Sequence, residues 1–253
     1  MTALSPEILI FVSLLIGIVA FCYASVGHGG ASGYLGVLSF FILAPKELSS
    51  TALLLNILVS ATSSYSYFKA GHLRQDLLRS FLITSVPFAF LGGTLHISVK
   101  LYSLILAVAL MIAAIRLNWK LQLKSMDAPK KLNSFWIPLL VGALIGVVSG
   151  LIGIEGGIFL SPLLLLANWA TPKESAAISA PFILVNSCAG LLGRYFSGAL
   201  VLGQMTPFLI CAFLGGLLGS HLGANRFTSS LLRAILAIVL ILASFKLSKI
   251  ALY

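Results

Sequence analysis

Charge is scarce in this chain of 253 residues, and acidic side chains are the scarcest. Asp and Glu together number 6, Lys and Arg number 16, and charged residues make up only 9% of the sequence. Soluble domains carry about 25% charged residues. Apolar residues, in contrast, make up 59% of the chain. The composition therefore excludes an ordinary soluble fold and predicts an all-α, multi-pass protein whose main partner is the lipid bilayer.

Cysteine and recognisable catalytic motifs are also scarce. Cys22, Cys188 and Cys211 lie inside apolar segments without CxxC or metal-like spacing, and we expect them to be buried thiols. The four histidines form no HExxH motif, so we expect no metal, no cofactor and no enzymatic activity. The basic residues are scattered at the edges of apolar runs rather than gathered in a patch, which indicates no nucleic-acid partner.

Apolar runs separated by short polar stretches follow one another along the chain. Most of them approach the roughly 20 residues that a helix needs to span a bilayer, whereas two are shorter. The runs are 8–26, 31–43, 49–68, 80–96, 99–115, 135–153, 157–168, 175–193, 204–224 and 229–247. The short ones are 31–43 and 157–168. We therefore expect a single integral membrane domain over residues 1–253.

Two glycine-rich breaks occur at matching places in the chain. The first, "SVGHGGASGYLG", occupies 25–36, and the second, "LIGIEGGIFLSP", occupies 151–162. A shift of 127 positions, from 29 to 156, superimposes their paired glycines and places His28 on Glu155. It also places Pro45-Lys46-Glu47 on Pro172-Lys173-Glu174. This register predicts an internal duplication, with one half at about 8–115, a linker at about 116–134 and the other half at about 135–253.

Two topologies agree with these segments. If the short segments enter and leave by one face, each half has four spanning helices plus one re-entrant helix, the halves are parallel, and the amino and carboxyl termini are cytoplasmic. If the short segments cross, the halves form an inverted five-plus-five repeat, which would explain why the loop at 194–203 carries only Arg194. Since the inverted arrangement would place Lys246 and Lys249 outside, the loop charges favour the parallel one.

The glycine breaks form the predicted binding site. A helix that starts inside a bilayer presents unpaired N–H groups and the positive end of its dipole, and both favour an anion. The predicted substrate-binding residues are Gly27, His28, Gly29, Gly30, Ser32, Asn56, Gly156, Gly157, Ser161 and Asn186. Two of them, Asn56 and Asn186, either donate an amide N–H to the anion or merely tie two helices together. Isolated glycines such as Gly142 and Gly146 are expected only to let helices approach closely.

Two ionisable residues accompany the breaks. An ionisable residue inside a membrane is a functional hypothesis by default, so His28 and Glu155 are predicted to handle protons that couple to anion movement. A two-fold related architecture would bring them face to face across the central site. The alternative is that both lie in a wet vestibule near the membrane face.

The order of elements resembles a known family. An apolar helix, a Gly-rich break, a short helix, a Pro-Lys-Glu turn and an Ala/Ser-rich helix, present twice, resemble the sulfite exporter TauE/SafE family, also called the 4-toluene sulfonate uptake permeases. "GLIGIEGGIFLSPLLLL" (150–166) resembles the second Gly-rich signature of the family, and "GHGGASGYLGVL" (27–38) resembles a first signature found in one branch. Glu155 departs from the pattern, because the family usually has a small residue there.

The resemblance implies a function. It indicates a secondary transporter that moves small sulfur-containing or organic anions, such as sulfite, sulfonates or sulfoacetate, across the bacterial inner membrane. Protons are the expected coupling ion. An anion channel, or a transporter of another small anion such as a carboxylate, would use the same features.

Overall fold

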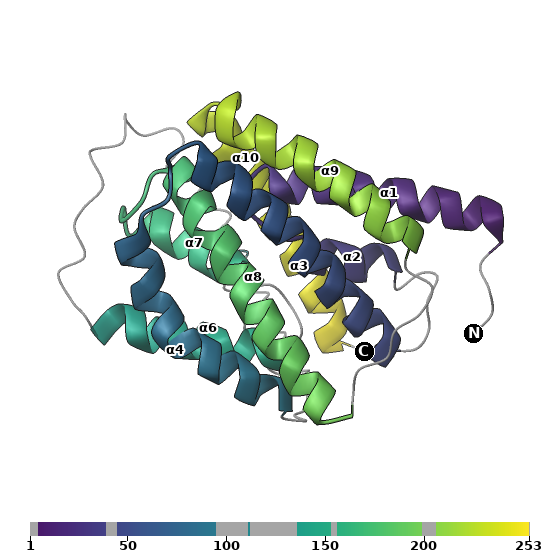
Figure 1. Ribbon diagram of the computed structural model, residues 1–253, viewed down its shortest axis with the longest axis horizontal. Coiled ribbons are helices and arrows are strands. Elements are labelled where there is room, and N and C mark those ends of the chain that lie inside the picture. Colours follow the sequence, from purple (N-terminus) through teal and green to yellow (C-terminus); the bar gives the residue numbers. More distant parts are fainter. Residues whose placement is uncertain are drawn as a thin grey trace.

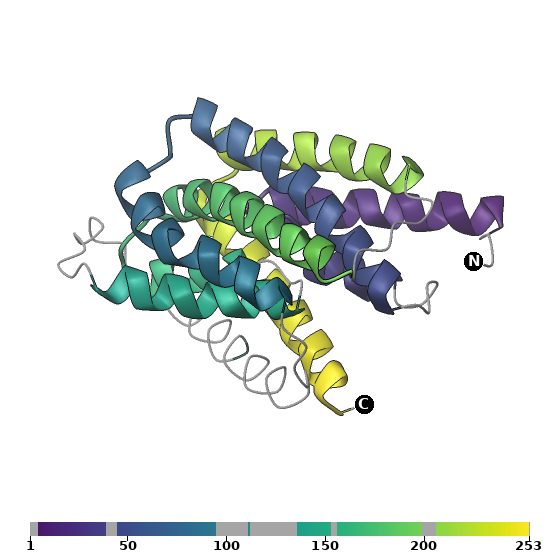
Figure 2. The same ribbon diagram turned by 60° about the horizontal axis from the view of Figure 1, so that its bottom comes forward.

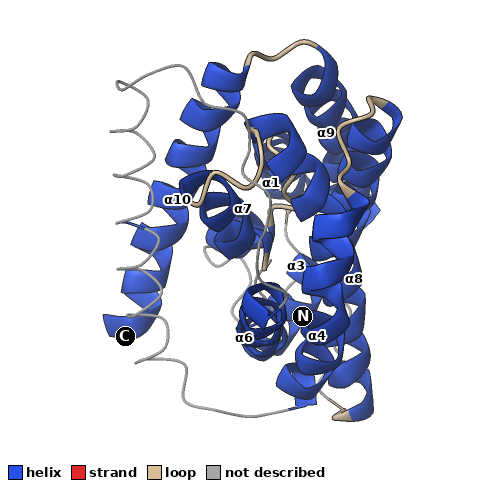
Figure 3. Cartoon of the chain, turned by 90° about the vertical axis from the view of Figure 1, so that its left-hand side faces the viewer, coloured by secondary structure: helices blue, strands red, loops and turns tan. Residues whose placement is uncertain are grey.

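All regular structure in the described part of the chain is helical (Figure 3). The computed structural model describes residues 5–38, 45–94, 111, 136–152, 156–198 and 206–252. The helices are α1 (Pro6–Ala24), α2 (Ala31–Leu38), α3 (Pro45–Lys69), α4 (Gln75–Thr94), α6 (Trp136–Ile152), α7 (Gly157–Leu166), α8 (Pro172–Phe196), α9 (Thr206–Asn225) and α10 (Ser229–Leu252). The all-α prediction is confirmed, and short helices follow both glycine breaks, as α2 and α7.

The outer surface of the bundle is apolar, as a bilayer requires. Four helices, α1, α4, α8 and α9, are long and apolar enough to cross a membrane. Large apolar side chains such as Phe11 of α1 and Leu218 of α9 point outward, with 56% and 62% of their surface exposed.

The cysteines also lie at or near this outer surface. Cys22 and Cys188 are exposed and Cys211 is half-buried, so the prediction of buried thiols was wrong. In a spanning helix an apolar residue can face lipid as readily as protein, so hydrophobicity alone does not indicate burial.

Glycine stripes bring pairs of helices into backbone contact. On α9, Gly215, Gly219 and Gly223 lie against the backbone of α1, and on α6, Gly142, Gly146 and Gly150 lie against the backbone of α4. A Cβ on any of these six glycines would collide with a carbonyl oxygen of the neighbouring helix. The packing role predicted for Gly142 and Gly146 is confirmed, and small residues spaced by four are the usual means of close packing in membranes.

The contacts between helices also give their directions. Along α1 and α9, Gly17 lies beside Gly215, Phe21 beside Gly219 and Ser25 beside Gly223, so the two helices are parallel. Along α3 and α9, Val59 lies beside Gly216 and Tyr67 beside Gly223, so these helices are parallel as well. Thus α1, α3 and α9 all run in one direction.

Three other helices, α4, α6 and α8, run in the opposite direction. On α4, Phe81, Ser85 and Ala89 lie beside Gly142, Gly146 and Gly150 of α6, so α4 and α6 are parallel. Ser85 also bonds Asn186 of α8, and Gly93 lies against Gly190 of α8, which makes α4 and α8 parallel. In contrast, Asn56 of α3 bonds Ser187 of α8, whereas Tyr67 of α3 clusters with Ala176, so α3 and α8 are antiparallel. In Figure 1, α1 and α9 lie at the upper right, α4 and α6 at the lower left, and α3 and α8 between them; Figure 2 preserves this order.

These directions favour the inverted arrangement. Because α1 and α3 are parallel, the chain between them, which includes α2, has to return from one end of the bundle to the other; the same holds for α7 between α6 and α8. The halves therefore run in opposite directions, which corrects the preference for parallel halves with re-entrant short helices. The loop charges misled because the preference depended on Lys246 and Lys249. A segment that is partly non-helical also needs fewer residues to cross, since an extended residue advances about 3.3 Å and a helical one about 1.5 Å. Common origin of the halves stays a prediction.

Labelling of single cysteines tests this topology. In a background lacking Cys22, Cys188 and Cys211, the inverted arrangement puts Glu7→Cys at one membrane face and Gln75→Cys at the other, and both positions are exposed. The α3–α4 loop and the helix ends beside it carry Lys69, Arg74 and Arg79, which marks this face as cytoplasmic. We expect an impermeant thiol reagent added to intact cells to label position 7, and to label position 75 only after permeabilisation. Labelling of both positions from the same side of the membrane would contradict the inverted arrangement and support parallel halves.

Thermal unfolding in detergent tests the glycine stripes. Gly219→Leu should lower the Tm, because its Cβ would meet the Phe21 backbone, whose Cα lies 2.8 Å away. Overpacking of this kind costs about 1–3 kcal/mol. The neighbouring lipid-facing substitution Leu218→Ala is the control and should leave the Tm nearly unchanged. Equal effects of the two changes would mean that α1 and α9 do not meet at Gly219.

Candidate functional site

The first glycine break ends α1 with a glycine-dependent cap. The N–H of Gly27 donates to the Ala24 carbonyl at 3.0 Å, and the N–H of His28 donates to the Tyr23 carbonyl at 2.9 Å. Gly27 has a φ of 76°, in the left-handed region, as this helix-terminating motif requires. The chain therefore leaves the helix here for a defined backbone reason, and His28 is the first residue beyond the cap.

The glycines of the first break are enclosed by both halves of the protein. Gly27 lies against the backbone of Ala176 in α8, and Gly29 lies against the side chain of Asn56 in α3. Gly30 has a φ of 92°, and a Cβ there would lie 2.8 Å from the ring of Tyr34. Since neither the backbone of Ala176 nor a buried ring can easily withdraw, side chains larger than hydrogen are excluded along this stretch.

His28 joins the two halves. Its side chain is fully buried, and its Nε2 lies 2.8 Å from the Oγ of Ser161, which belongs to the other short helix, α7. The Ser161 Oγ lies 2.7 Å from the Oγ of Ser179 in α8, and the Oγ of Ser175 donates to the Ser161 carbonyl at 3.3 Å. Because His28 is fully buried, it does not lie in a wet vestibule, which was the alternative considered for it. It lies instead at the end of a chain of hydroxyl groups between the halves.

Asn56 links the start of α2 to α8. Its Oδ1 accepts from the N–H of Ala31, the first residue of α2, at 3.3 Å. Its Nδ2 donates to the Oγ of Ser187 at 2.7 Å. Two roles were considered for Asn56, donation to an anion and a bond between helices. The structure shows the second, because Asn56 joins α3 to α2 and α8. One of the N–H groups expected to face an anion is thus already bonded to Asn56.

Asn186 makes the corresponding tie between α8 and α4. Its Nδ2 donates to the Oγ of Ser85 at 3.1 Å and to the Phe182 carbonyl at 2.8 Å. Its Oδ1 has no hydrogen-bond partner among the described residues, and neither does Nδ1 of His28. Buried polar atoms without partners are rare in proteins, so both mark places where a further donor or acceptor would be stabilising.

The second glycine break lies against the same part of α8. A Cβ on Gly156 would lie 3.0 Å from the ring of Phe182, and one on Gly157 would meet the side chain of Ile183. The start of α7 therefore adjoins α8 directly, whereas the start of α2 is linked to Ser187 of α8 through Asn56. Ser32, another predicted residue, lies 3.0 Å from the hydroxyl of Tyr23. Glu155 lies outside the described residues, so its predicted position facing His28 stays a prediction.

Four serines of this region were not among the predicted residues. Ser175, Ser179, Ser187 and Ser85 each contact a predicted residue. A signal for the first three is present in the sequence, because they are spaced by four and eight positions and so share one face of a helix. Ser85 has no comparable signal.

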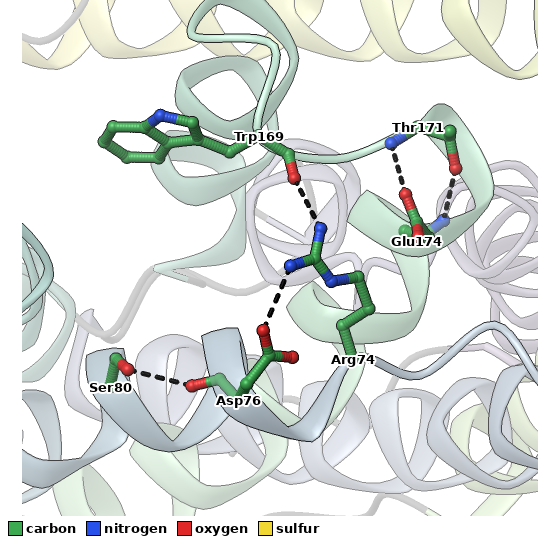
Figure 4. A network of polar contacts seen from close by, with 6 residues as sticks. All are labelled: Arg74, Asp76, Ser80, Trp169, Thr171 and Glu174. Atoms are coloured by element: carbon green, nitrogen blue, oxygen red, sulfur yellow. Dashed lines mark hydrogen bonds and ion pairs between the residues drawn. The ribbon is translucent and has the colours of Figure 1, made fainter. Parts of the chain in front are cut away.

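At one end of the bundle, the α3–α4 loop is bonded to the second half. Arg74 donates from Nη1 to the Trp169 carbonyl in the α7–α8 turn at 3.0 Å, and from Nη2 to Asp76 at 3.0 Å (Figure 4). His72 Nε2 lies 3.2 Å from the Ala224 carbonyl near the end of α9. These contacts join the two halves where α7 ends and α8 begins.

The Pro-Lys-Glu turn of the second half begins α8. Thr171 Oγ1 accepts from the N–H of Glu174 at 3.3 Å, while Glu174 Oε2 accepts from the N–H of Thr171 at 2.7 Å. This reciprocal pair is a capping box, which satisfies two N–H groups at the helix start (Figure 4). The motif thus sets the residue at which α8 starts, and the start of the helix in turn determines how far along it Ser179 and Ser187 lie.

Comparison with known proteins gives a family. Residues 9–247 match the model of the family described as "Sulfite exporter TauE/SafE". A probable membrane transporter protein, y4hK, of Sinorhizobium fredii is 34% identical over 233 residues, which cover 91% of this chain and 94% of that protein. No solved structure matches. The family match spans both glycine breaks and every helix between them, and the chain therefore belongs to the TauE/SafE sulfite exporter family of membrane transporters.

Proposed function

We propose that this protein is a secondary transporter of small sulfur-containing or organic anions, of the sulfite, sulfonate or sulfoacetate class. The anion would bind where the two glycine breaks meet α8. The observation that carries this proposal is the bond between His28 of the first break and Ser161 of the second short helix, because it places residues of both breaks at one buried point.

The chemistry around this point suits an oxyanion. Hydroxyl groups of Ser161, Ser179 and Ser187 can turn their protons toward a ligand oxygen, and a hydroxyl rotates without moving the backbone. The first turns of α2 and α7 add the positive ends of two helix dipoles. Nδ1 of His28, which has no partner among the described residues, offers a further group for the ligand.

Transport would follow from the contacts between the halves. The bonds from His28 to Ser161 and from Asn56 to Ser187 both cross from the first half to the second. An anion bound between these residues would replace the protein partners of their donors, which lowers the cost of separating the halves. Alternating exposure of a site at the interface of two repeats is the usual mechanism in secondary transporters.

Proton coupling is assigned in this proposal to His28 and Glu155. His28 is fully buried beside the hydroxyl chain, so a change of its protonation would act directly on a bound anion. Glu155 lies within the second break, directly before its paired glycines, Gly156 and Gly157. A carboxylate so close to an anion site would have to be neutralised by a proton or by a cationic imidazole whenever the anion is bound.

Flux into proteoliposomes, with sulfite, sulfonates and small carboxylates as substrates, tests the proposed function. We expect sulfite or sulfonate uptake against a concentration gradient when a pH gradient is imposed, whereas a channel would only equilibrate the anion. Gly30→Ala should abolish this flux, because its Cβ would crowd the ring of Tyr34. Gly71→Ala is the matched control: Gly71 also has a positive φ, 76°, but nothing lies within 4 Å of its Cβ position. If Gly30→Ala were as active as Gly71→Ala, the first break would not form the site.

A second measurement tests the coupling. Glu155→Gln should retain exchange of labelled anion across the membrane, because the amide removes only the charge and the titrating proton. It should lose the stimulation of uptake by a pH gradient. Unchanged stimulation in Glu155→Gln would remove this residue from the coupling mechanism.

A further inference from the structure

Arg194, near the end of α8, carries a positive charge that no described group neutralises. Its side chain is half-buried. Within the described part of the chain, its buried Nε has no hydrogen-bond partner, and no carboxylate forms an ion pair with its guanidinium. A charge that is partly removed from water costs free energy unless an opposite charge accompanies it. An anion from outside the chain would therefore be stabilising beside Arg194.

The side chain of Arg194 leaves α8 on the face that contacts the candidate site. Arg194 follows Ile183 by 11 positions and Ser187 by 7, which is about three and about two helical turns, so the three residues share one face. Ile183 lies against Gly157 of the second break, and Ser187 is bonded to Asn56. Arg194 thus extends the face of α8 along which the glycine breaks are held.

The opposite side of this end of α8 faces outward. The large side chains of Leu192, Tyr195 and Phe196 have 53%, 63% and 71% of their surface exposed, as lipid-facing residues do. An arginine that served lipid headgroups would be expected among these side chains, with its charge extended to the membrane surface. Because Arg194 lies on the other side of the helix, its position favours a role inside the protein.

The end of α8 does not require the guanidinium as a cap. The Gly193 carbonyl accepts from the N–H of Ser197 at 3.1 Å, and the Tyr195 carbonyl accepts from the N–H of Gly198 at 3.1 Å. The carbonyl of Arg194 itself accepts from the Oγ of Ser197 at 3.1 Å. A basic side chain near a helix end commonly binds such carbonyls, but here other donors already occupy them.

Arg194 lies at the end of the bundle that is remote from the cytoplasmic loop. The chain enters α8 directly after Trp169, whose carbonyl is bonded to Arg74 of the α3–α4 loop. Since the positive charges around that loop mark the cytoplasmic face, the other end of α8 is extracytoplasmic. Ser187 lies about 10 Å deeper along the helix, because each residue advances about 1.5 Å. An anion that enters along this face of α8 from outside therefore meets Arg194 before Ser187.

We propose that Arg194 is an outer anion-binding point, which the substrate occupies between the external solution and the site at the glycine breaks. A planar guanidinium can bind two oxygens of a sulfite, sulfonate or carboxylate group through parallel N–H bonds. The inference rests on the proposed function and adds to it a second place where the anion is held.

Exchange kinetics in proteoliposomes test this inference, with labelled sulfite and methanesulfonate as the anions. Arg194→Gln should raise the KM about tenfold or more, because a charge-assisted pair with the anion is lost. The maximal rate should change much less, since the groups at the glycine breaks stay intact. Arg194→Lys, which keeps the charge but not the planar fork, should give an intermediate KM. The matched control is Arg226→Gln, which removes an exposed arginine just after α9 and should leave the KM unchanged.

A cysteine at the same position tests the charge and the side of access. In the background lacking native cysteines, Arg194→Cys should react with impermeant thiol reagents added to intact cells, and the substrate anion should slow this reaction. Attachment of a trimethylammonioethyl group, which is positive, should lower the KM toward the wild-type value. Attachment of a sulfonatoethyl group, which is negative, should not lower it. Both reagents enlarge the side chain, so a difference between them reports charge rather than packing.

The outcomes separate this inference from the proposed function. Equal KM values for the wild-type protein and Arg194→Gln, equal effects of the two reagents, or no reaction from outside would each overturn the outer binding point. Arg194 would then serve helix packing or lipid headgroups, while transport by the wild-type protein would leave the proposed function intact. Absence of transport of both anions by the wild-type protein would overturn the proposed function and this inference together.

Discussion

Every backbone N–H and C=O group inside a bilayer needs a partner, because lipid supplies none, and two interrupted helices meet this demand only where protein surrounds them. At the first break the demand is met by the cap at Gly27 and by Asn56, which receives the N–H of Ala31. Both depend on the second half: Gly27 lies against Ala176, and Asn56 is held by Ser187. The breaks therefore require the association of the halves, and the glycine stripes of α9 and α6 make that association close enough.

The same constraint shapes the interior. Where two helices stop, neutral side chains with both donors and acceptors can satisfy many different backbone and side-chain partners, and serine does so with the least volume. Charged side chains would need paired partners of their own in a region that water does not reach. The result, among the described residues, is a set of hydroxyls, two amides and one imidazole that are linked to one another by hydrogen bonds.

Much of this was predictable from sequence, and the reason differs from residue to residue. The helical membrane fold and the short helices follow from composition and from the repeated glycine pattern, which are local signals. The same signals singled out His28, Ser161, Asn56 and Asn186, whose role in binding stays a prediction. That His28 meets Ser161 is a contact across 133 positions, for which local periodicity carries no information. The direction of the halves was predicted wrongly because the prediction depended on two charges, Lys246 and Lys249, whereas the contacts between distant helices that fix it leave no local signal. Ser85 was missed because its partner lies on a helix 101 positions away.

Asn56 holds a position with a mechanical consequence. One arm of its amide caps α2, while the other is bonded to Ser187 on the opposite half. A hydrogen bond is lost when its atoms separate by more than a few tenths of an ångström beyond contact. If α8 slid past α3 by even a fraction of a helical turn, the Asn56 amide could keep its bond to Ala31 or its bond to Ser187, but not both. Any such movement would therefore break one of the two bonds, and loss of the bond to Ala31 would take from the first N–H of α2 the partner that Asn56 supplies.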